Sequence, residues 1–393
     1  MAEIGLLYDQ SETDELGIKL TAKNMNIDIV YLPFFKTSFT FNKDEYRYRT
    51  LGKDYTKVLK DVKVVLNRCQ SKNRRQYASA ILENLDKHVL NPQIVEYNCY
   101  SKIRTLLAFA SAGINIPKTL YISSNVKESV SSGGIQDYTG YICSLIEKEL
   151  SKDIVIKPDA GTQGKGVSLS RGRKELEINL DAISPGTVNP SGILAQEYIP
   201  KWFYDLRIIV VKKKGSPPFC YENALARGNL REFRTNTFLG SMVFRAKLPK
   251  TVRATAEKCA GILGRDQDAW VIALDAMPEI TPELMQDEKQ LKNNFEALEK
   301  PFSKVKNIKN MPRKKQRFKE YTQQITRAYR EYMETESYKF IESIVNKTLR
   351  KTADKVYFHE GNACPEFWEQ TRVVAGINLA EDLLYCALSL MDS

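Results

Sequence analysis

The sequence predicts an α/β fold built from more than one subdomain, and three observations support this prediction. Short apolar runs typical of buried strands alternate with stretches whose apolar residues recur at helical spacing. The chain has 393 residues, whereas single domains mostly run about 100 to 150 residues. A glycine-rich loop follows one of the predicted strands, in the segment VIKPDAGTQGKGVSL at 155–169.

The composition is that of a globular protein, with 42% apolar and 27% charged residues. No apolar run reaches the roughly 18 to 20 residues that cross a bilayer, and the start carries acidic residues where a signal peptide would carry basic ones. We therefore expect a cytoplasmic protein without a membrane partner. Seven cysteines without a CxxC pair argue against a disulfide framework or a zinc site, so reduced and mostly buried thiols are expected. Two histidines argue against a histidine triad or a multi-histidine metal site.

The first part of the chain reads as a small α/β domain that ends near residue 95. Apolar runs at 3–8 and 62–67 predict strands of an open sheet, and the segment around AKNM predicts a helix between them. The following stretch, which contains Lys102 in its first turn, predicts a helix that stops at Gly113. One face of this helix carries Ile103, Leu106, Leu107 and Ala110.

The alternation continues along the rest of the chain. Residues 119–172 predict a strand, an amphipathic helix near 135–150 and a hairpin that carries the glycine loop. Further strands are expected in LAQEYIP, DLRIIVVKKKG, WVIALDAM and KVYFHEGN. Helices are expected at 251–264 with Val252, Ala256, Cys259 and Leu263 on one side, in a tract with Tyr321, Ile325, Tyr329 and Tyr332 on one side, and at about 378–391.

The glycine loop is the most informative local feature. Gly161, Gly164 and Gly166 let the chain fold back so that backbone N–H groups can close on phosphate oxygens, while Lys157 supplies a point charge. A nucleoside triphosphate is therefore the first ligand to consider. For this stretch taken alone, a plain hairpin remains the alternative.

Charged and amide side chains stand at the ends of the predicted elements. They are Lys102, Lys157, Asp205, Arg207, Arg234, Asn236, Asp275, Glu360 and Asn362. Carboxylates and amides are the hard oxygen ligands that magnesium prefers, and a magnesium ion held by few protein groups keeps positions for phosphates. Each residue alone could be a cap, a paired charge or a surface group. Their co-occurrence favours a magnesium–phosphate site enclosed by lysines and arginines.

The order of the motifs closely resembles that of ATP-grasp ligases of the RimK/LysX branch, which add amino acids to a carboxylate. The motifs are NCYSKIRT, VIKPDAGTQGKGV, AQEYIPKWFYDLRIIVV, REFRTN, ALDAM and HEGNACPEFW. The resemblance implies an α/β (α+β) ATP-grasp fold in three parts. These are an N-terminal open α/β pre-ATP-grasp domain (1–95), a central lid domain (96–190) and a C-terminal catalytic domain (191–393) with a basic helical insertion at about 278–355. The segments IGLLYD, VVLNRCQSKNRR and NPQIVEYNCYSK are similar to lysine- and arginine-biosynthesis ligases that act on an acidic amino-group carrier protein.

The resemblance also implies a role for each motif residue. Lys102 and Lys157 match the lysines that contact the α- and β-phosphates, and Thr162, Gln163, Gly164 and Gly166 match the loop that folds over the triphosphate. Glu197, Tyr198 and Ile199 match the hinge that holds adenine, with Asp205 and Arg207 just beyond it. Arg227, Arg234 and Asn236 match positions around the γ-phosphate and the reacting acyl group, while Asp275, Glu360 and Asn362 match the magnesium ligands. Arg234, Arg207 and Asn236 are the expected catalytic residues.

The implied reaction joins an amine to a carboxylate through an acyl phosphate and releases ADP and phosphate. Phosphoryl transfer needs charge neutralisation and alignment more than acid–base groups, which suits a site rich in lysine and arginine. The expected cofactors are ATP and two Mg²⁺ ions, which Mn²⁺ could replace. The expected substrates are an amino acid and an acceptor carboxylate, either a C-terminal glutamate on an acidic carrier protein or a small-molecule acid. A homo-oligomer, dimer or tetramer, is also expected.

The sequence departs from the resembled pattern in three places. Asp275 and Glu360 stand 85 positions apart, and most of this distance is the basic insertion, where 301–319 has eight basic and no acidic residues. Such a run is typical of a solvated face or loop, and it could also be a dimer arm or a docking surface for an acidic protein. Nucleic acid is not the expected partner. Gly361 and the residues after Pro365 also differ from the pattern, which puts the substrate in question more than the reaction.

Two other functions stay open at this point. A kinase that phosphorylates a small polyol would need the same ATP cage without an amine pocket. A nucleic-acid- or protein-binding module with an inactive ATP site is the second alternative. The presence of Asp275, Glu360 and Asn362 argues against it, because an inactive site has no reason to keep all three.

Overall fold

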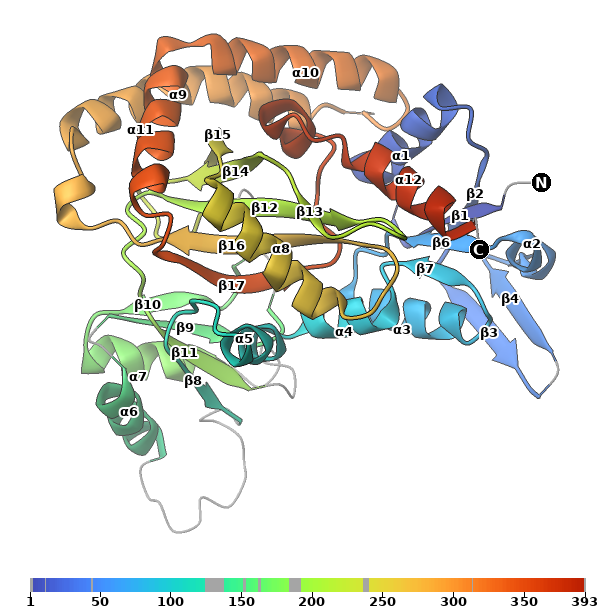
Figure 1. Ribbon diagram of the computed structural model, residues 1–393, viewed down its shortest axis with the longest axis horizontal. Coiled ribbons are helices and arrows are strands. Elements are labelled where there is room, and N and C mark those ends of the chain that lie inside the picture. Colours follow the sequence, from blue (N-terminus) through green and yellow to red (C-terminus); the bar gives the residue numbers. More distant parts are fainter. Residues whose placement is uncertain are drawn as a thin grey trace.

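The structure is a computed structural model. It describes residues 3–10, 12–43, 45–123, 138–150, 153–161, 164–183, 192–235, 240–312 and 314–391. Figure 1 shows a large central sheet, a second sheet near both chain ends and a smaller sheet at the lower left of the view. Within the described residues no helix is long and apolar enough to cross a membrane.

The N-terminal sheet is parallel, with strand order β2-β1-β6-β7. Its strands are β1 (Ile4–Tyr8), β2 (Ile29–Pro33), β6 (Val64–Asn67) and β7 (His88–Leu90), and its helices are α1 (Thr13–Asn24) and α3 (Lys72–Glu83). Alternate residues of β1 and β6 enter different apolar clusters, Leu6 and Leu66 in one and Leu7 and Val65 in the other. Both strands are therefore covered on two faces, as expected of a parallel sheet. The predicted strands at 3–8 and 62–67 and the helix between them are confirmed.

A small antiparallel sheet extends the N-terminal part and was not predicted. It comprises β3 (Thr37–Phe41), β4 (Tyr46–Thr50) and β5 (Lys53–Asp54), followed by α2 (Thr56–Asp61). Tyr48 is fully buried and stacks on Phe39 with ring centroids 4.8 Å apart. This aromatic pair fixes the hairpin against the neighbouring core.

The small sheet, with order β10-β9-β11-β8, is antiparallel and has its own apolar core. The chain reaches it through α4 (Gln93–Tyr100) and α5 (Lys102–Ser111), and its elements are β8 (Thr119–Ile122), α6 (Tyr138–Glu149), β9 (Ile154–Pro158), β10 (Ser168–Ser170), α7 (Arg173–Ala182) and β11 (Ile193–Glu197). The predicted helix with Lys102 in its first turn, its end before Gly113, the helix near 135–150 and the glycine-loop hairpin are confirmed. The predicted apolar face of α5 is wrong, because Thr105, Leu106 and Phe109 are buried whereas Leu107 is 59% exposed. Strand β11 completes this sheet although it lies beyond the predicted boundary at residue 190.

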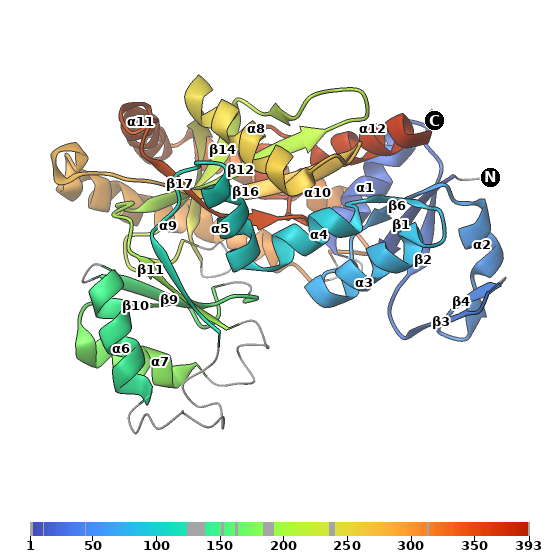
Figure 2. The same ribbon diagram turned by 60° about the horizontal axis from the view of Figure 1, so that its bottom comes forward.

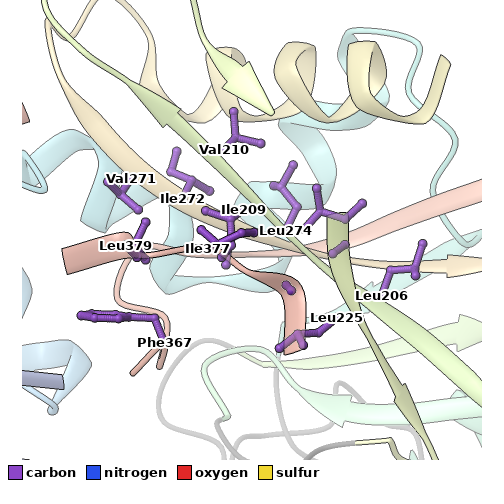
Figure 3. Close-up of a cluster of buried hydrophobic side chains, with 14 of the residues drawn as sticks. Leu206, Ile209, Val210, Leu225, Val271, Ile272, Leu274, Phe367, Ile377 and Leu379 are labelled. Atoms are coloured by element: carbon purple, nitrogen blue, oxygen red, sulfur yellow. The ribbon is translucent and has the colours of Figure 1, made fainter. Parts of the chain in front are cut away.

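The large sheet has the order β15-β14-β12-β16-β17, with β13 paired to β12. Its strands are β12 (Tyr204–Lys212), β13 (Phe219–Cys220), β14 (Asn223–Gly228), β15 (Met242–Lys247), β16 (Trp270–Pro278) and β17 (Val356–Asn362); α8 (Lys250–Gly264), η4 (Thr371–Ala375) and α12 (Leu379–Met391) pack nearby. Figure 3 shows side chains of β12, β14 and β16 meeting Phe367, Ile377 and Leu379. The predicted face of α8 is buried, which confirms that helix.

The insertion after β16 forms three helices, of which α9 and α10 lie above β14 and β15 in Figure 1 and α11 lies to their left. After η3 (Pro282–Leu284) they are α9 (Glu288–Lys309), α10 (Phe318–Glu334) and α11 (Glu336–Lys351). Phe244 of β15 contacts Phe295 and Tyr338 at ring-centroid distances of 5.7 and 5.4 Å. The predicted face with Tyr321, Ile325, Tyr329 and Tyr332 is buried. These side chains belong to the same apolar cluster as the large sheet, so the three helices share its core. Burial of one large apolar side chain such as Phe295 stabilises the fold by about 1.5–3 kcal/mol.

The basic run at 301–319 is less free than its sequence suggests. Residues 301–309 belong to α9 and bury Phe302 and Val305, so of the two expected forms, a solvated face and a loop, this half is a helix with one exposed face. Several of its basic groups have partners within the chain: Lys309 with Glu369 at 2.8 Å, Lys315 with Glu12 at 3.2 Å and Arg317 with Glu320 at 2.6 Å.

Candidate active site

The glycine loop joins β9 to β10 and brings Lys157 to the junction of the two sheets. Lys157 is 6% exposed near the end of β9. Gly164 and Gly166 have φ angles of 72° and 70°, in the left-handed region that glycine adopts without strain. Burial and the neighbouring Lys102 lower the pKa of Lys157 to about 8. An anion bound beside this ammonium group would offset the free-energy cost of its desolvation.

The first turn of α5 is tied to the glycine loop through Asp159. The Asp159 carboxylate accepts hydrogen bonds from the Ser101 hydroxyl and the Ile103 backbone N–H, both at 2.7 Å. Lys102 Nζ donates to the backbone oxygens of Asp159 at 3.1 Å and Gly161 at 2.7 Å. These bonds fix Lys102 beside Lys157. The sequence did not predict a role for Asp159, because no pattern in the sequence links it to Ser101 or Ile103.

A row of charged side chains crosses the large sheet at its junction with the small one. In the strand register Arg227 faces Asp205, Arg207 faces Asp275, and Asp275 faces Glu360. Arg207 makes a two-point contact with Asp275 at 2.9 and 3.0 Å. Arg227 bridges Asp205 at 2.7 Å and Asp275 at 3.1 Å. Register partners on neighbouring strands share a face, so pairing of the strands assembles this row.

The two aspartates of this row are ionised. Burial alone would raise the pKa of Asp275, but the Arg207 and Arg227 guanidiniums hold it well below its usual range. Burial alone would also raise the pKa of Asp205, but the positive charges of Arg227 and Lys201 lower it below its usual value. Lys201 donates to Thr235 Oγ1 at 2.6 Å and lies 3.5 Å from Asp205 Oδ2.

Strand β17 contributes Glu360 and Asn362 and contains a bulge. The register runs from Asp275–Glu360 directly to Ala276–Phe358, which leaves His359 as the extra residue. The bulge lets His359 and Glu360 line the same cavity although they are adjacent in the strand. Both ring nitrogens of His359 are buried and find no hydrogen-bond partner among the residues that the structure describes. Burial and Lys157 lower the pKa of His359 to about 4, so the ring is neutral at pH 7.

One cavity of about 180 Å³ brings most of the predicted site residues together. Those that line it are Lys102, Lys157, Gly164, Glu197, Tyr198, Ile199, Asp205, Arg207, Arg227, Arg234, Asp275, Glu360 and Asn362. Gly166 lies in the glycine loop but not in the lining, and Thr162, Gln163 and Asn236 lie outside the described residues. Lining residues that sequence analysis missed include Lys72, Lys201, Phe233, Met277 and His359. The lining has eight lysines and arginines against four carboxylates, an excess that complements a triphosphate.

The hinge and Arg234 make contacts within the chain that their predicted roles did not include. The amides of Glu197 and Tyr198 donate to the carbonyls of Lys118 and Asp153 at 3.0 and 2.9 Å. Of the three hinge amides, only that of Ile199 has no acceptor among the residues that the structure describes. Arg234 pairs with Glu232 at 2.7 Å and donates to the Gly164 carbonyl at 3.3 Å, which joins its loop to the glycine loop.

The oxygen donors on β16 and β17 fit a magnesium ion that shares its ligands with phosphates. Asp275 and Glu360 are ionised register partners, and Asn362 follows Glu360 on the same strand face. Each carboxylate oxygen has a second lone pair beyond its contact to arginine or lysine. Across the ranges that the structure describes, no three acidic, histidine or cysteine side chains gather to enclose a metal. An open set of this kind suits Mg²⁺, which keeps other positions for phosphate and water.

Comparison with known proteins agrees with this geometry. Residues 99–277 match the family model described as the RimK-like ATP-grasp domain. This stretch of the chain is similar to a RimK-like ATP-grasp domain. It includes α5, the glycine loop, the hinge and the strands that carry Asp205, Arg227 and Asp275.

Curated relatives extend beyond the ATP-grasp domain. The "Alpha-aminoadipate--LysW ligase LysX" of Sulfurisphaera tokodaii is 26% identical over 262 residues, which are 66% of this chain and 81% of the relative. A "Probable alpha-L-glutamate ligase" of Serratia proteamaculans is 31% identical over 194 residues, 48% of this chain and 57% of the relative. An ATP-dependent ligase is the enzyme class that these relatives support.

Solved structures show the same fold over the whole chain. D-alanyl-alanine synthetase A of Vibrio cholerae superposes with a TM-score of 0.57 at 9% identity, covering 100% of both chains. The macrocyclase MdnC of Microcystis aeruginosa, bound to its precursor peptide MdnA, gives a TM-score of 0.54 at 15% identity, covering 99% of this chain and 100% of that one. The predicted ATP-grasp fold is therefore confirmed.

Proposed function

We propose that this protein is an ATP-dependent carboxylate–amine ligase that works through an acyl phosphate. The observation that carries the proposal is the cavity lined by eight basic and four acidic side chains together with glycines of the glycine loop. The family match and the ligases among the relatives support the same reaction class.

The reaction has two steps with balanced bond changes. A carboxylate oxygen of the acid attacks the γ-phosphorus of ATP, the bond from that phosphorus to the β-phosphate oxygen breaks, and ADP leaves. The amine nitrogen then attacks the acyl carbon of the acyl phosphate, the carbon–oxygen bond to phosphate breaks, and inorganic phosphate leaves while the nitrogen loses a proton. Neither step needs a histidine triad, because charge neutralisation and alignment dominate phosphoryl transfer.

The described residues divide these tasks. Lys102 and Lys157, held at the glycine loop, would neutralise the α- and β-phosphates. Arg234 and Arg207 would stabilise the transferring phosphoryl group and the tetrahedral intermediate, with Asn236 as a further candidate from the sequence. Asp275, Glu360 and Asn362 would hold Mg²⁺, which would neutralise part of the phosphate charge.

The amine is proposed to come from an amino acid, and the acid to be a C-terminal glutamate or a similar carboxylate. The relatives, an alpha-aminoadipate–LysW ligase and a probable alpha-L-glutamate ligase, support an amino-acid substrate. An acidic carrier protein as acceptor is supported by Lys304 and Lys306, two exposed lysines of α9 for which the described residues give no ion pair. The predicted homo-oligomer and cytoplasmic location remain predictions.

A screen of ADP release tests the proposed function. The panel contains the twenty amino acids and α-aminoadipate as amines, each with and without acetylated peptides that end in glutamate. In parallel assays hydroxylamine replaces the amine and traps an acyl phosphate as the hydroxamate. Acid-dependent ADP release with amide or hydroxamate formation is expected. Phosphorylation of a polyol without an amine would favour the kinase alternative, and nucleotide binding without turnover would favour the inactive module.

A further inference from the structure

Lys72 lies in the ATP cavity but comes from the N-terminal sheet region, outside the matched ATP-grasp domain. It is the first residue of α3, where Ser71 caps the helix by accepting the Arg74 backbone N–H at 3.4 Å. Its side chain is 17% exposed. The cap and the helix therefore hold an ammonium group at the cavity wall without help from the glycine loop.

The Lys72 ammonium has few internal partners. Its Nζ lies 3.8 Å from Glu360 Oε1, and Lys102 Nζ lies at the same distance from this oxygen. Lys102 also donates to two carbonyls, and Lys201 donates to Thr235 beside Asp205. For Lys72 the described part of the chain provides no hydrogen bond, although an ammonium has three donors to satisfy. An anion in the cavity would meet this need.

The position of Lys72 distinguishes it from the phosphate-binding lysines. Lys102 and Lys157 are attached to the glycine loop, whereas α3 lies beyond α5 and α4 from the small sheet in Figures 1 and 2. Lys72 therefore reaches Glu360 from an element separate from the glycine loop. An in-line transfer requires the attacking carboxylate to lie on the side of the γ-phosphate opposite the departing ADP, and under the proposed function Asp275 and Glu360 would hold Mg²⁺ at those phosphates.

We propose that Lys72 binds the carboxylate of the acid substrate and orients it towards the γ-phosphate. This inference rests on the proposed function and adds a substrate-binding residue to it. A lysine is a compact point charge on a flexible stem, suited to hold one carboxylate oxygen while the other reacts. The link to Glu360 would place that carboxylate beside the magnesium ligands.

The test compares Lys72→Met with Lys63→Met. Lys63 is 58% exposed and pairs with Glu3 on the surface, so its variant controls for loss of a lysine. The probe is an acetylated peptide ending in glutamate, or free L-glutamate if the wild type uses only that, with hydroxylamine as nucleophile. For Lys72→Met the KM of the acid is expected to rise about tenfold or more, while the KM of ATP stays within about twofold.

Several outcomes separate this inference from the proposed function. An unchanged acid KM, or a rise in the KM of ATP instead, would overturn the role of Lys72 and leave the ligase assignment intact. Absence of acid-dependent ADP release in the wild type would remove the proposed function and this inference with it. Lys72→Gln serves as a second variant, and binding of Mg-ADP shows whether each variant is folded. If one of the two variants unfolds, the other still provides the KM comparison.

Discussion

Replacing Asp159 tests whether Lys102 is positioned by the hydrogen bonds that join α5 to the glycine loop. In Asp159→Ala the Ser101 hydroxyl and the Ile103 amide lose their acceptors, both now at 2.7 Å. The Asp159 backbone oxygen remains available to Lys102, so the substitution removes the support and not the contact itself. We expect weaker ATP binding with a chain that still folds.

The magnitude follows from the two lost bonds. A hydrogen bond to a charged group contributes about 1.5–3 kcal/mol, so both together amount to roughly 3–6 kcal/mol. If about half of this free energy fixes Lys102, the KM of ATP rises about ten- to a hundredfold. Asp159→Asn keeps one oxygen acceptor for the Ile103 amide and is expected to raise the KM only a few-fold.

Steady-state ADP release at saturating acid and amine measures this effect. Asp266→Ala, at an exposed aspartate after α8, serves as the matched control and is expected to behave like the wild type. An unchanged KM of ATP in Asp159→Ala, or an equal effect of the alanine and asparagine variants, would refute the reasoning.

Three further predictions follow from the site and the insertion. Arg234→Ala is expected to lower kcat by about 10²–10³ with the KM of ATP within several-fold, and undiminished turnover would exclude Arg234 from the mechanism. Because the pKa of Lys157 is lowered to about 8, its charge is present below that pH and lost above it. The KM of ATP should therefore be flat below about pH 7 and rise above pH 8; Lys157→Arg should abolish that rise, and a flat wild-type profile would contradict this role. Lys304→Glu with Lys306→Glu should raise the KM of an acidic protein acceptor, less so at high salt, and leave free amino acids unaffected; no change would argue against docking on α9.

Local patterns in the sequence were sufficient to predict most elements of the sheets. The four apolar residues at helical spacing in α8 and the tyrosine series of α10 are buried as expected, because each helix has one apolar stripe. The hairpin of β3 and β4 was missed, although Tyr46, Arg47, Tyr48 and Arg49 alternate in the manner of a half-buried strand. That signal was available but had no neighbouring motif to draw attention to it.

The candidate site was predictable where strand ends carry motif residues and not where the fold alone brings groups together. Asp275 and Glu360 could be named from the motifs despite the long insertion between them, and the structure places them as register partners. Lys72 could not, because only the packing of α3 brings it to Glu360. His359 could not either, since a regular strand would point it away from Glu360 and the bulge reverses this.

The most direct test of the central claim follows oxygen from the acid to phosphate. The acid substrate is prepared with ¹⁸O in its carboxylate and incubated with ATP, Mg²⁺ and the amine, and the released phosphate is examined by mass spectrometry. An acyl phosphate predicts that one ¹⁸O atom passes from the carboxylate to inorganic phosphate for each amide formed. Unlabelled phosphate formed together with amide would contradict activation of the carboxylate by ATP.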